Sequence, residues 1–554
     1  MACCLLAALV LAVDAYFSAQ EGYLSRPADY DGIGYMVFAR SAYLLLAGFH
    51  LHSGLVQLLT IAPGWNAALA FQYLVLGAGT WQSFTVRFWG VALLLVLVYW
   101  IVRRRAPRSL AIAALVITAL LPVVSAGVRS SSWEFFSGQA NYYENFGLDD
   151  LRPDLLAIAL MLWSIAILAE HGDRPTRPTF VVSAVFAAAA VLVKPSTSPL
   201  MLLIWGAVLS ATWFWNRRRQ GVLRDSALGI AVLVLLLLPW ASVGKGVLSV
   251  VNYLYAVSVT YRGAYVINAG LPERLTYYLV RIPTDLGQLE AWLVIAGALV
   301  ATIALVRRRL GRPEIVYAAV ALLFYVVFVQ SPASNSHLAE WISLALWIFF
   351  WAGLARLAVV RWPVLIQRAT RPVLGAVGVY VLVVYALGVV AVANWPANEQ
   401  RSNVQLSEVT TSLAHELGAH ISTGDCFAFA PGPSWPATIQ FVLMDANGKW
   451  PASTATDIDI TTKTSDYVAT AKKCAAVIAY RENITQVAQA FYAPVAYQPY
   501  LQAVADWVRS PGSGYSLDRS WSFSDLAPFG AHTLGHYQGV SLTVDLYLRS
   551  PGQS

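Results

Sequence analysis

Asp29 and Asp31 are the first residues in this sequence whose type and position point to chemistry. They stand directly before Gly32 to Arg40, a segment with the composition of an amphipathic helix that would lie at the boundary between water and lipid. Partial desolvation at such a boundary makes a carboxylate a stronger proton acceptor. Asp31 is therefore our first candidate for a catalytic base, and Asp29 is the second. The alternative is that either residue only caps the following helix.

Three cations form a second group of candidates. Arg87 precedes an apolar run, Lys194 follows one, and Arg152 belongs to the sequence Arg152-Pro153-Asp154 at the start of another. Two of these sites also have a structural alternative. Arg152-Pro153-Asp154 has the composition of a helix start, and Lys194 could extend to lipid headgroups.

Other polar residues offer weaker candidates. The acidic group Glu144, Asp149 and Asp150 could hold a divalent cation through oxygen ligands, or could be a solvated loop. His337 precedes an apolar run and could contact a substrate on the same side as the first loop. The sequence requires no cofactor, and a divalent metal is the only one that these residues suggest.

The composition places these residues in a membrane protein. The chain has 554 residues, of which 58% are hydrophobic and 12% are charged, whereas soluble domains carry about 25% charged residues. The net charge of +7 could suggest a nucleic-acid partner. Because the arginines stand in short clusters between apolar runs, we expect no nucleic acid and attribute the charge to membrane topology.

Apolar runs of about the length that crosses a bilayer recur along the first 395 residues. They predict about eleven spanning helices, near 1–17, 83–102, 109–127, 152–169, 179–193, 198–215, 227–241, 291–306, 315–330, 341–360 and 373–394. The stretch Leu55 to Leu76 is also apolar, but Pro63-Gly64 interrupts it. We therefore expect interfacial helices there.

Clusters of arginine fall in alternate loops between these runs. They include Arg103-Arg104-Arg105, Arg217-Arg218-Arg219 and Arg307-Arg308-Arg309. The positive-inside rule places such loops in the cytoplasm. The long loops that carry the candidate residues, and the C-terminal region, are then expected outside it.

The chain changes character near residue 396, which predicts a transmembrane domain over 1–395 and a soluble domain over 396–554. Turn residues there separate short runs that suit strands, at Cys426 to Ala430, Ala475 to Tyr480 and Val540 to Leu548. We expect a small extracytoplasmic α/β domain. In an oxidising compartment Cys426 and Cys474 could form a disulfide, or they could be two buried thiols.

The spacing of Asp31, Tyr35, Ala39 and Arg40 resembles the first-loop signature of the GT-C superfamily of membrane glycosyltransferases, which includes the aminoarabinose transferases and the protein O-mannosyltransferases. In many members Glu stands where this sequence has Gly32, so the second carboxylate of the pair is missing unless Asp29 replaces it.

The resemblance continues through roughly the first two hundred residues. Pro63 and Arg87 follow in the same order, Arg152-Pro153-Asp154 is similar to the Arg-x-Asp entry to the fourth span, and Val193-Lys194-Pro195 is similar to the Lys-Pro turn after the fifth.

The resemblance implies a GT-C-like fold and an inverting glycosyltransferase that takes a sugar from a polyprenyl-phosphate carrier outside the cytoplasm. The acceptor would be a hydroxyl of a glycan, a lipid or a protein, and the location would be a bacterial plasma membrane. Asp31 or Asp29 would be the base, and the carrier phosphate would be bound by Lys194, Arg152 and Arg87. Substrate contacts would come from Tyr35, His337 and Asp154.

Two other classes remain open at this point. One is a transporter or flippase of a lipid-linked sugar, and the other is a membrane scaffold whose external domain binds a partner. Bond formation between sugar and acceptor would separate the enzyme from both.

Overall fold

The computed structural model describes most of the chain, with gaps. The described residues are 2–20, 22, 24, 31–125, 151–217, 221–243, 246–255, 270–307, 310–330, 338–361, 363–393, 397–422, 424–429, 435–445, 448–449, 453–454, 464–490, 498–526 and 539–550. Asp29, Glu144, Asp149, Asp150 and His337 lie outside this set. The side chain of Asp31 lies outside it as well, so the roles assigned to these residues stay predictions.

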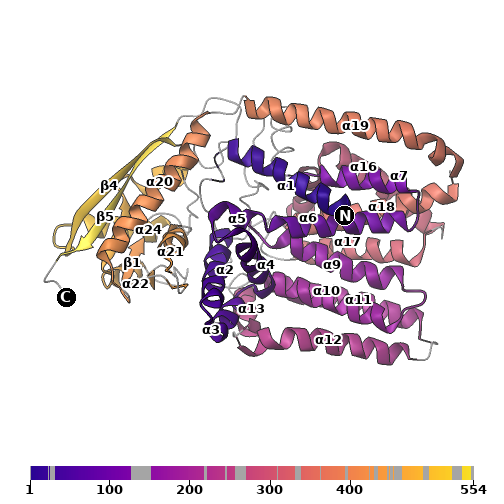
Figure 1. The fold of residues 1–554 in the computed structure, drawn as a ribbon, viewed down its shortest axis with the longest axis horizontal. Helices are drawn as coiled ribbons and strands as arrows, with labels where there is room; N and C mark the ends of the chain where they lie inside the picture. Colours follow the sequence, from indigo (N-terminus) through magenta and orange to yellow (C-terminus); the bar gives the residue numbers. More distant parts are fainter. Residues whose placement is uncertain are drawn as a thin grey trace.

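A bundle of long helices makes up the first part of the chain, and every predicted apolar run coincides with one of them (Figure 1). They are α1 (Ala2–Gln20), α6 (Arg87–Arg103), α7 (Arg108–Ala119), α9 (Asp154–Glu170), α10 (Arg177–Val193), α11 (Ser198–Trp215), α12 (Val222–Val243), α16 (Gln288–Val306), α17 (Arg312–Gln330), α18 (Ala339–Arg361) and α19 (Pro363–Ala393). The run expected over 109–127 is shorter than predicted, because α7 ends at Ala119 and turns follow it.

Six helices in the described ranges are long and apolar enough to cross a bilayer. They are Ala2–Gln20, Thr80–Arg103, Pro195–Trp215, Val222–Val243, Arg312–Gln330 and Ala339–Leu357. Others, such as Arg177–Val193, are apolar but shorter. The prediction of a multi-pass, mainly helical membrane protein is confirmed.

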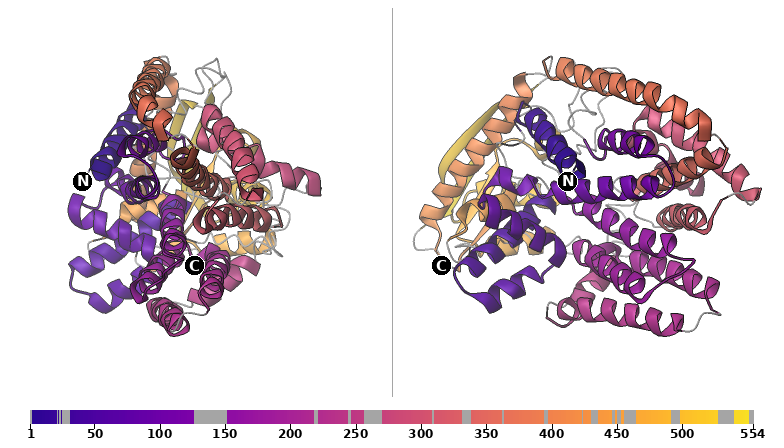
Figure 2. Two further views of the ribbon diagram at one scale, coloured as in Figure 1. Left: turned by 90° about the vertical axis from the view of Figure 1, so that its right-hand side faces the viewer. Right: turned by 45° about the vertical axis from the view of Figure 1, so that its right-hand side comes forward.

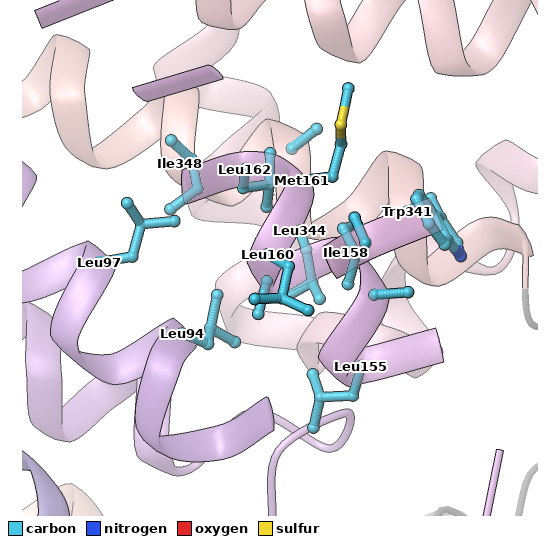
Figure 3. Close-up of a cluster of buried hydrophobic side chains, with 14 of the residues drawn as sticks. Leu94, Leu97, Leu155, Ile158, Leu160, Met161, Leu162, Trp341, Leu344 and Ile348 are labelled. Carbon is cyan, nitrogen blue, oxygen red and sulfur yellow. The ribbon is translucent and has the colours of Figure 1, made fainter. Parts of the chain in front are cut away.

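Helix α9 lies at the centre of the bundle. Its residues are apolar on all sides, and a helix of that composition is stable only when it is surrounded. Leu94 and Leu97 of α6 pack on one side of it, and Leu344 and Ile348 of α18 pack on another (Figure 3). Because α9 is so deeply buried, the residues at its two ends are held in defined positions.

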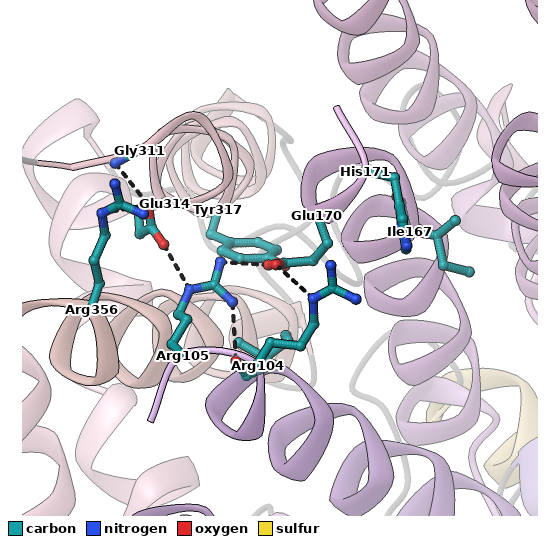
Figure 4. A network of polar contacts seen from close by, with 10 residues as sticks. Arg104, Arg105, Ile167, Glu170, His171, Gly311, Glu314, Tyr317 and Arg356 are labelled. Carbon is teal, nitrogen blue, oxygen red and sulfur yellow. Dashed lines mark hydrogen bonds and ion pairs between the residues drawn. The ribbon is translucent and has the colours of Figure 1, made fainter. Parts of the chain in front are cut away.

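A buried ionic network closes one end of the bundle (Figure 4). Arg105 Nη2 lies 2.6 Å from Glu170 Oε1, and Arg105 Nε lies 2.8 Å from Glu314 Oε1. Tyr317 donates a hydrogen bond of 2.7 Å to Glu170. These residues connect the end of α6, the end of α9 and the start of α17. Since buried charges must be paired, the network holds the arginine-bearing loops together at this end.

Short helices lie across the opposite end of the bundle, between it and the C-terminal domain (Figure 1). They are α2 (Asp31–Ala47), α3 (Leu51–Leu58), α4 (Pro63–Leu76), α5 (Thr80–Phe84) and α13 (Gly246–Tyr255). The helices α14 (Leu271–Leu279), α15 (Ile282–Leu286) and the 3₁₀ turn η2 (Pro195–Thr197) complete the connections.

The apolar stretch over 55–76 is not one continuous helix. Its backbone turns at Ile61, whose φ is 50°, and Pro63 begins the next helix. The expected break is therefore confirmed. Helix α2 is not the amphipathic helix that we expected, because its apolar side chains are not confined to one face. Helices α3 and α4 and the C-terminal domain cover it, so it has no broad face toward water.

The C-terminal domain follows α19 and begins with α20 (Ala397–His420). Its five-stranded sheet has the order β2-β1-β3-β5-β4. The strands are β1 (Cys426–Phe429), β2 (Ser453–Thr454), β3 (Ala476–Tyr480), β4 (Tyr515–Leu526) and β5 (Val540–Arg549), and the remaining helices are α21 (Trp435–Leu443), α22 (Thr464–Ala471), α23 (Ile484–Ala490) and α24 (Gln498–Arg509). Strands β1, β2 and β3 pair in parallel, whereas β5 pairs antiparallel with β3 and β4.

Helices cover both faces of this sheet. Leu413 and Leu417 of α20 pack on one face, and Val504 and Val508 of α24 pack in the core on the other. The right-hand view of Figure 2 shows the domain beyond one end of the helical bundle. The three predicted strands and the α/β class are confirmed, while β2 and β4 were not predicted.

Cys426 and Cys474 form a disulfide, as predicted. Cys426 begins β1, and Cys474 stands two residues before β3. The neighbouring strands bring their Cα atoms to 4.6 Å from each other. The parallel pairing of β1 with β3 therefore explains why two cysteines distant in sequence meet.

Candidate functional site

A small pocket opens where α6, α9 and α18 begin and where α7 and α10 end, on the side of the bundle that carries α2 to α5. It is lined by Trp65, Arg87, Gly90, Val123, Arg152, Asp154, Leu155, Leu156 and Glu340. Arg87, Arg152 and Asp154 were singled out from the sequence, and the fold brings all three to one place.

Arg87 is the first residue of α6 and is 8% exposed. Its Nη2 atom donates a hydrogen bond of 2.9 Å to the carbonyl oxygen of Val123, which follows α7. Gly90 lies one turn further along α6, and a Cβ atom there would come within 3.0 Å of the backbone nitrogen of Leu156. Glycine therefore lets the start of α6 approach the start of α9, and this approach forms one wall of the pocket.

Arg152 forms a second part of the pocket with Glu340. Arg152 Nη2 lies 3.6 Å from Glu340 Oε1, and the Arg152 side chain is 22% exposed, whereas the Glu340 side chain is almost fully buried. Sequence reasoning missed Glu340. The available signal was an acidic residue directly before the apolar run 341–360, on the side where the candidate residues were expected.

Lys194 directly follows α10 and is bound to Asp154. Its ammonium group contacts Asp154 Oδ1, and the indole nitrogen of Trp341 donates a hydrogen bond of 3.0 Å to the same oxygen atom. Both charged side chains are buried. The alternative that Lys194 extends to lipid headgroups is therefore wrong. Helix α9 begins at Asp154, directly after Pro153, as the composition of a helix start indicated.

Helix α4 covers the pocket from the side of the first loop. Gly64 lets it approach the end of α10, because a Cβ atom there would lie 2.9 Å from the backbone nitrogen of Val193. The next residue, Trp65, lines the pocket and is 2% exposed. Its indole nitrogen has no hydrogen-bond partner among the described residues. The pocket therefore offers one neutral donor beside its cations.

The first loop contributes α2, which begins at Asp31. The roles of Asp31 as a helix cap or as a catalytic carboxylate stay predictions, because its side chain is outside the described set. Tyr35 is half-buried and packs against the main core. Arg40 serves another purpose: Nη1 donates a hydrogen bond of 2.6 Å to the carbonyl oxygen of Phe441, and the guanidinium lies 4.5 Å from the Phe441 ring centre. Arg40 therefore docks the C-terminal domain onto α2, a role that the sequence did not indicate.

One group of described residues has the spacing of metal ligands. Glu416 and His420 of α20 and Asp518 of β4 present ligand atoms within 4.8 Å of one another. Glu416 is also bound by Arg519, and that hydrogen bond is the main reason why the pKa of Glu416 is lowered. The group lies in the C-terminal domain and contributes nothing to the pocket.

A buried acidic residue in α1 was also missed by sequence reasoning. Asp14 is 1% exposed, and Ser125 donates a hydrogen bond of 3.2 Å to its Oδ1 atom. The signal was a single carboxylate within the first apolar run.

The structure is similar to that of ArnT from Cupriavidus metallidurans in the apo state, with a TM-score of 0.54 and 16% identity over 87% of this chain and 93% of that chain. The same protein bound to undecaprenyl phosphate gives a TM-score of 0.51 and 14% identity over 87% and 94% of the two chains.

A more distant likeness, to the oligosaccharyltransferase AglB from Archaeoglobus fulgidus, has a TM-score of 0.46 and 12% identity over 97% of this chain and 88% of that chain. No protein-family model matches the sequence, and no curated protein is similar to it. The two comparisons with ArnT therefore establish the fold, and the fold class expected from the sequence is confirmed.

Proposed function

We propose that this protein is a membrane glycosyltransferase that moves a sugar from a polyprenyl-phosphate carrier to an acceptor hydroxyl. The observation that carries the proposal is the pocket of Arg87, Arg152, Asp154 and Glu340 at one end of the bundle. The structure of ArnT bound to undecaprenyl phosphate, which has the same fold, supports a lipid phosphate as the ligand. The lipid tail would lie between the helices, and the phosphate would meet the cations.

In this proposal Arg87 and Arg152 contact the carrier phosphate directly, since both line the pocket. A guanidinium binds phosphate oxygens through two parallel N–H groups. Lys194 acts indirectly, because its ammonium group contacts the Asp154 carboxylate and holds it in place at the pocket. Interactions of this kind are stronger where water is excluded, and they stabilise the charge on the departing phosphate.

Asp31 is the proposed base, with Asp29 in reserve. A carboxylate oxygen of the base takes the proton of the acceptor hydroxyl while the oxygen of that hydroxyl attacks the anomeric carbon. The bond between this carbon and the phosphate oxygen breaks, and its electron pair leaves with the carrier phosphate. One base suffices for such a displacement, which inverts the anomeric centre. Tyr35, Asp154 and His337 are proposed to contact the substrate.

The proposed orientation places the pocket and the C-terminal domain outside the cytoplasm, in a bacterial plasma membrane. It is supported by the arginine-rich loops, which gather at the other end of the bundle. The acceptor is a glycan, a lipid or a protein. The proposal requires no cofactor and no nucleic-acid partner, and the acidic group Glu144, Asp149 and Asp150 stays a candidate for a divalent cation or a solvated loop.

The test is transfer of labelled sugar by the purified full-length protein in liposomes, with a panel of polyprenyl-phosphate sugars. Arg87→Gln should weaken donor binding, whereas Arg224→Gln, a change at an exposed arginine at the opposite end, should not. Movement of the labelled carrier across the bilayer without bond formation would replace the enzyme by a flippase.

The base is tested by Asp31→Asn, with Asp29→Asn as the matched control. Asparagine caps a helix about as well as aspartate, but it cannot accept a proton at neutral pH. If Asp31 is the base, folding should persist while the transfer rate falls by roughly a hundredfold or more. Unchanged transfer by both variants would exclude a first-loop carboxylate as the base.

A further inference from the structure

A second pocket lies at the opposite end of the bundle, where α9 and α11 end and α17 begins. It is wide and open, and it is lined by Asp173, Arg174, Phe214, Trp215, Asn216, Arg217 and Arg312. None of these residues belongs to the proposed transfer site. The pocket brings together three basic segments that are far apart in the sequence.

The walls of this pocket are connected by the buried hydrogen bonds of Asn216 and by an exposed ion pair between Arg312 and Asp173. Asn216 is 8% exposed, and its Nδ2 atom donates hydrogen bonds of 2.5 Å to the Gly172 carbonyl and 2.8 Å to the Thr212 carbonyl. The end of α11 is thereby joined to the loop after α9. Arg312 Nη1 donates to Asp173 Oδ1 at 2.8 Å and joins the start of α17 to the same loop.

The ionic network of Figure 4 is built from residues close in sequence to two of these walls. Glu170 stands three residues before Asp173, and Glu314 stands two residues after Arg312, and both carboxylates bind Arg105. The network therefore anchors the end of α9 and the start of α17, the two elements that carry Asp173 and Arg312.

The pocket is cationic and has an aromatic rim. Its three arginines and one aspartate give a net charge of +2 (3 − 1). The Arg217 guanidinium lies 4.7 Å from the Phe214 ring centre, and the Arg312 guanidinium lies 5.5 Å from the Trp215 ring centre. A guanidinium that stacks on an aromatic ring still has the N–H groups of its own plane free to donate hydrogen bonds. Their geometry matches the oxygen atoms of a phosphate.

We propose that this pocket binds the headgroup of an anionic phospholipid. Trp215 ends an apolar helix long enough to span the bilayer, and tryptophan at such a position lies at the depth of the headgroups. Phe214 is 54% exposed and offers an apolar surface to an acyl chain. Basic pockets between membrane helices bind anionic lipid headgroups that carry one or more separate phosphate groups. In the proposed orientation the lipid belongs to the inner leaflet, and the inference does not depend on the transfer reaction.

The experiment is native mass spectrometry of the delipidated full-length protein with cardiolipin, and with phosphatidylcholine as the uncharged comparison. The variant is Arg174→Gln with Arg217→Gln, two surface changes that leave Asn216 and Arg312 in place. We expect the apparent affinity for cardiolipin to fall about thirtyfold. Lysine at both positions should retain most of the binding, because it keeps the charge.

Arg224→Gln is the control, since Arg224 is exposed at the same end but does not line the pocket. Equal binding of cardiolipin by the wild type and the double glutamine variant would overturn the proposal, and so would equal binding of phosphatidylcholine. Inorganic phosphate at millimolar concentration should not displace cardiolipin. Full displacement by phosphate would assign the pocket to a free anion in place of a lipid.

Discussion

Removing the positive charge of Lys194 should destabilise the protein strongly. In Lys194→Met the carboxylate of Asp154 stays buried, with its side chain 3% exposed, and loses the ammonium group that neutralises it. Methionine keeps most of the apolar volume, so the change isolates the charge. Breaking a buried ion pair by removing one partner costs about 3 to 5 kcal/mol. We expect a loss of unfolding free energy in that range.

The double variant Lys194→Met with Asp154→Asn should recover most of that loss. Asparagine keeps the shape of Asp154 and can still accept the hydrogen bond from Trp341, but it carries no charge that must be compensated. The assay is chemical unfolding of each variant in the same detergent and lipid mixture. Lys473→Met, a change at an exposed lysine of the C-terminal domain, is the control and should stay within about 0.5 kcal/mol of the wild type.

The reasoning is refuted if Lys194→Met costs less than about 1 kcal/mol and Asp154→Asn does not alter that cost, since removing one partner of a buried ion pair is expensive. Donor binding gives a second readout. A stable double variant that still binds the polyprenyl-phosphate sugar poorly would show that the charges also act on the donor.

Three further predictions follow from single features of the fold. Cys426→Ser should lower the stability of the C-terminal domain by about 2 to 4 kcal/mol, as measured by its unfolding, with mass spectrometry verifying the disulfide in the wild type. A reporter fused after Arg219 should read cytoplasmic and one after Ser554 external, and a cytoplasmic C-terminus would contradict the orientation. Arg40→Gln should loosen the contact with Phe441 and speed amide exchange in α21; unchanged exchange would show that Arg40 does not hold the domain.

The sequence alone determined the helices, their membrane character and part of the C-terminal sheet. Apolar runs of spanning length have few alternatives to a helix in a bilayer, because the backbone must satisfy its own hydrogen bonds there. Alternation of the arginine clusters predicted that their loops share one end of the bundle, where Arg105, Arg174 and Arg217 lie. Three strands were predictable from short apolar runs, but β4 was not. Its residues are mostly exposed and polar, so no such run marks it.

Only the tertiary structure decided which polar residues meet. Asp154 contacts Lys194 and Trp341, which stand 40 and 187 residues further along the chain. Arg40 binds the carbonyl of a residue 401 positions away. A hydrophobic pattern indicates which residues avoid lipid, but the order of helices in the bundle determines which helix ends come together. At the pocket that order depends on close backbone approaches at Gly64 and Gly90, which are set by packing in three dimensions and leave no periodic signal in the sequence.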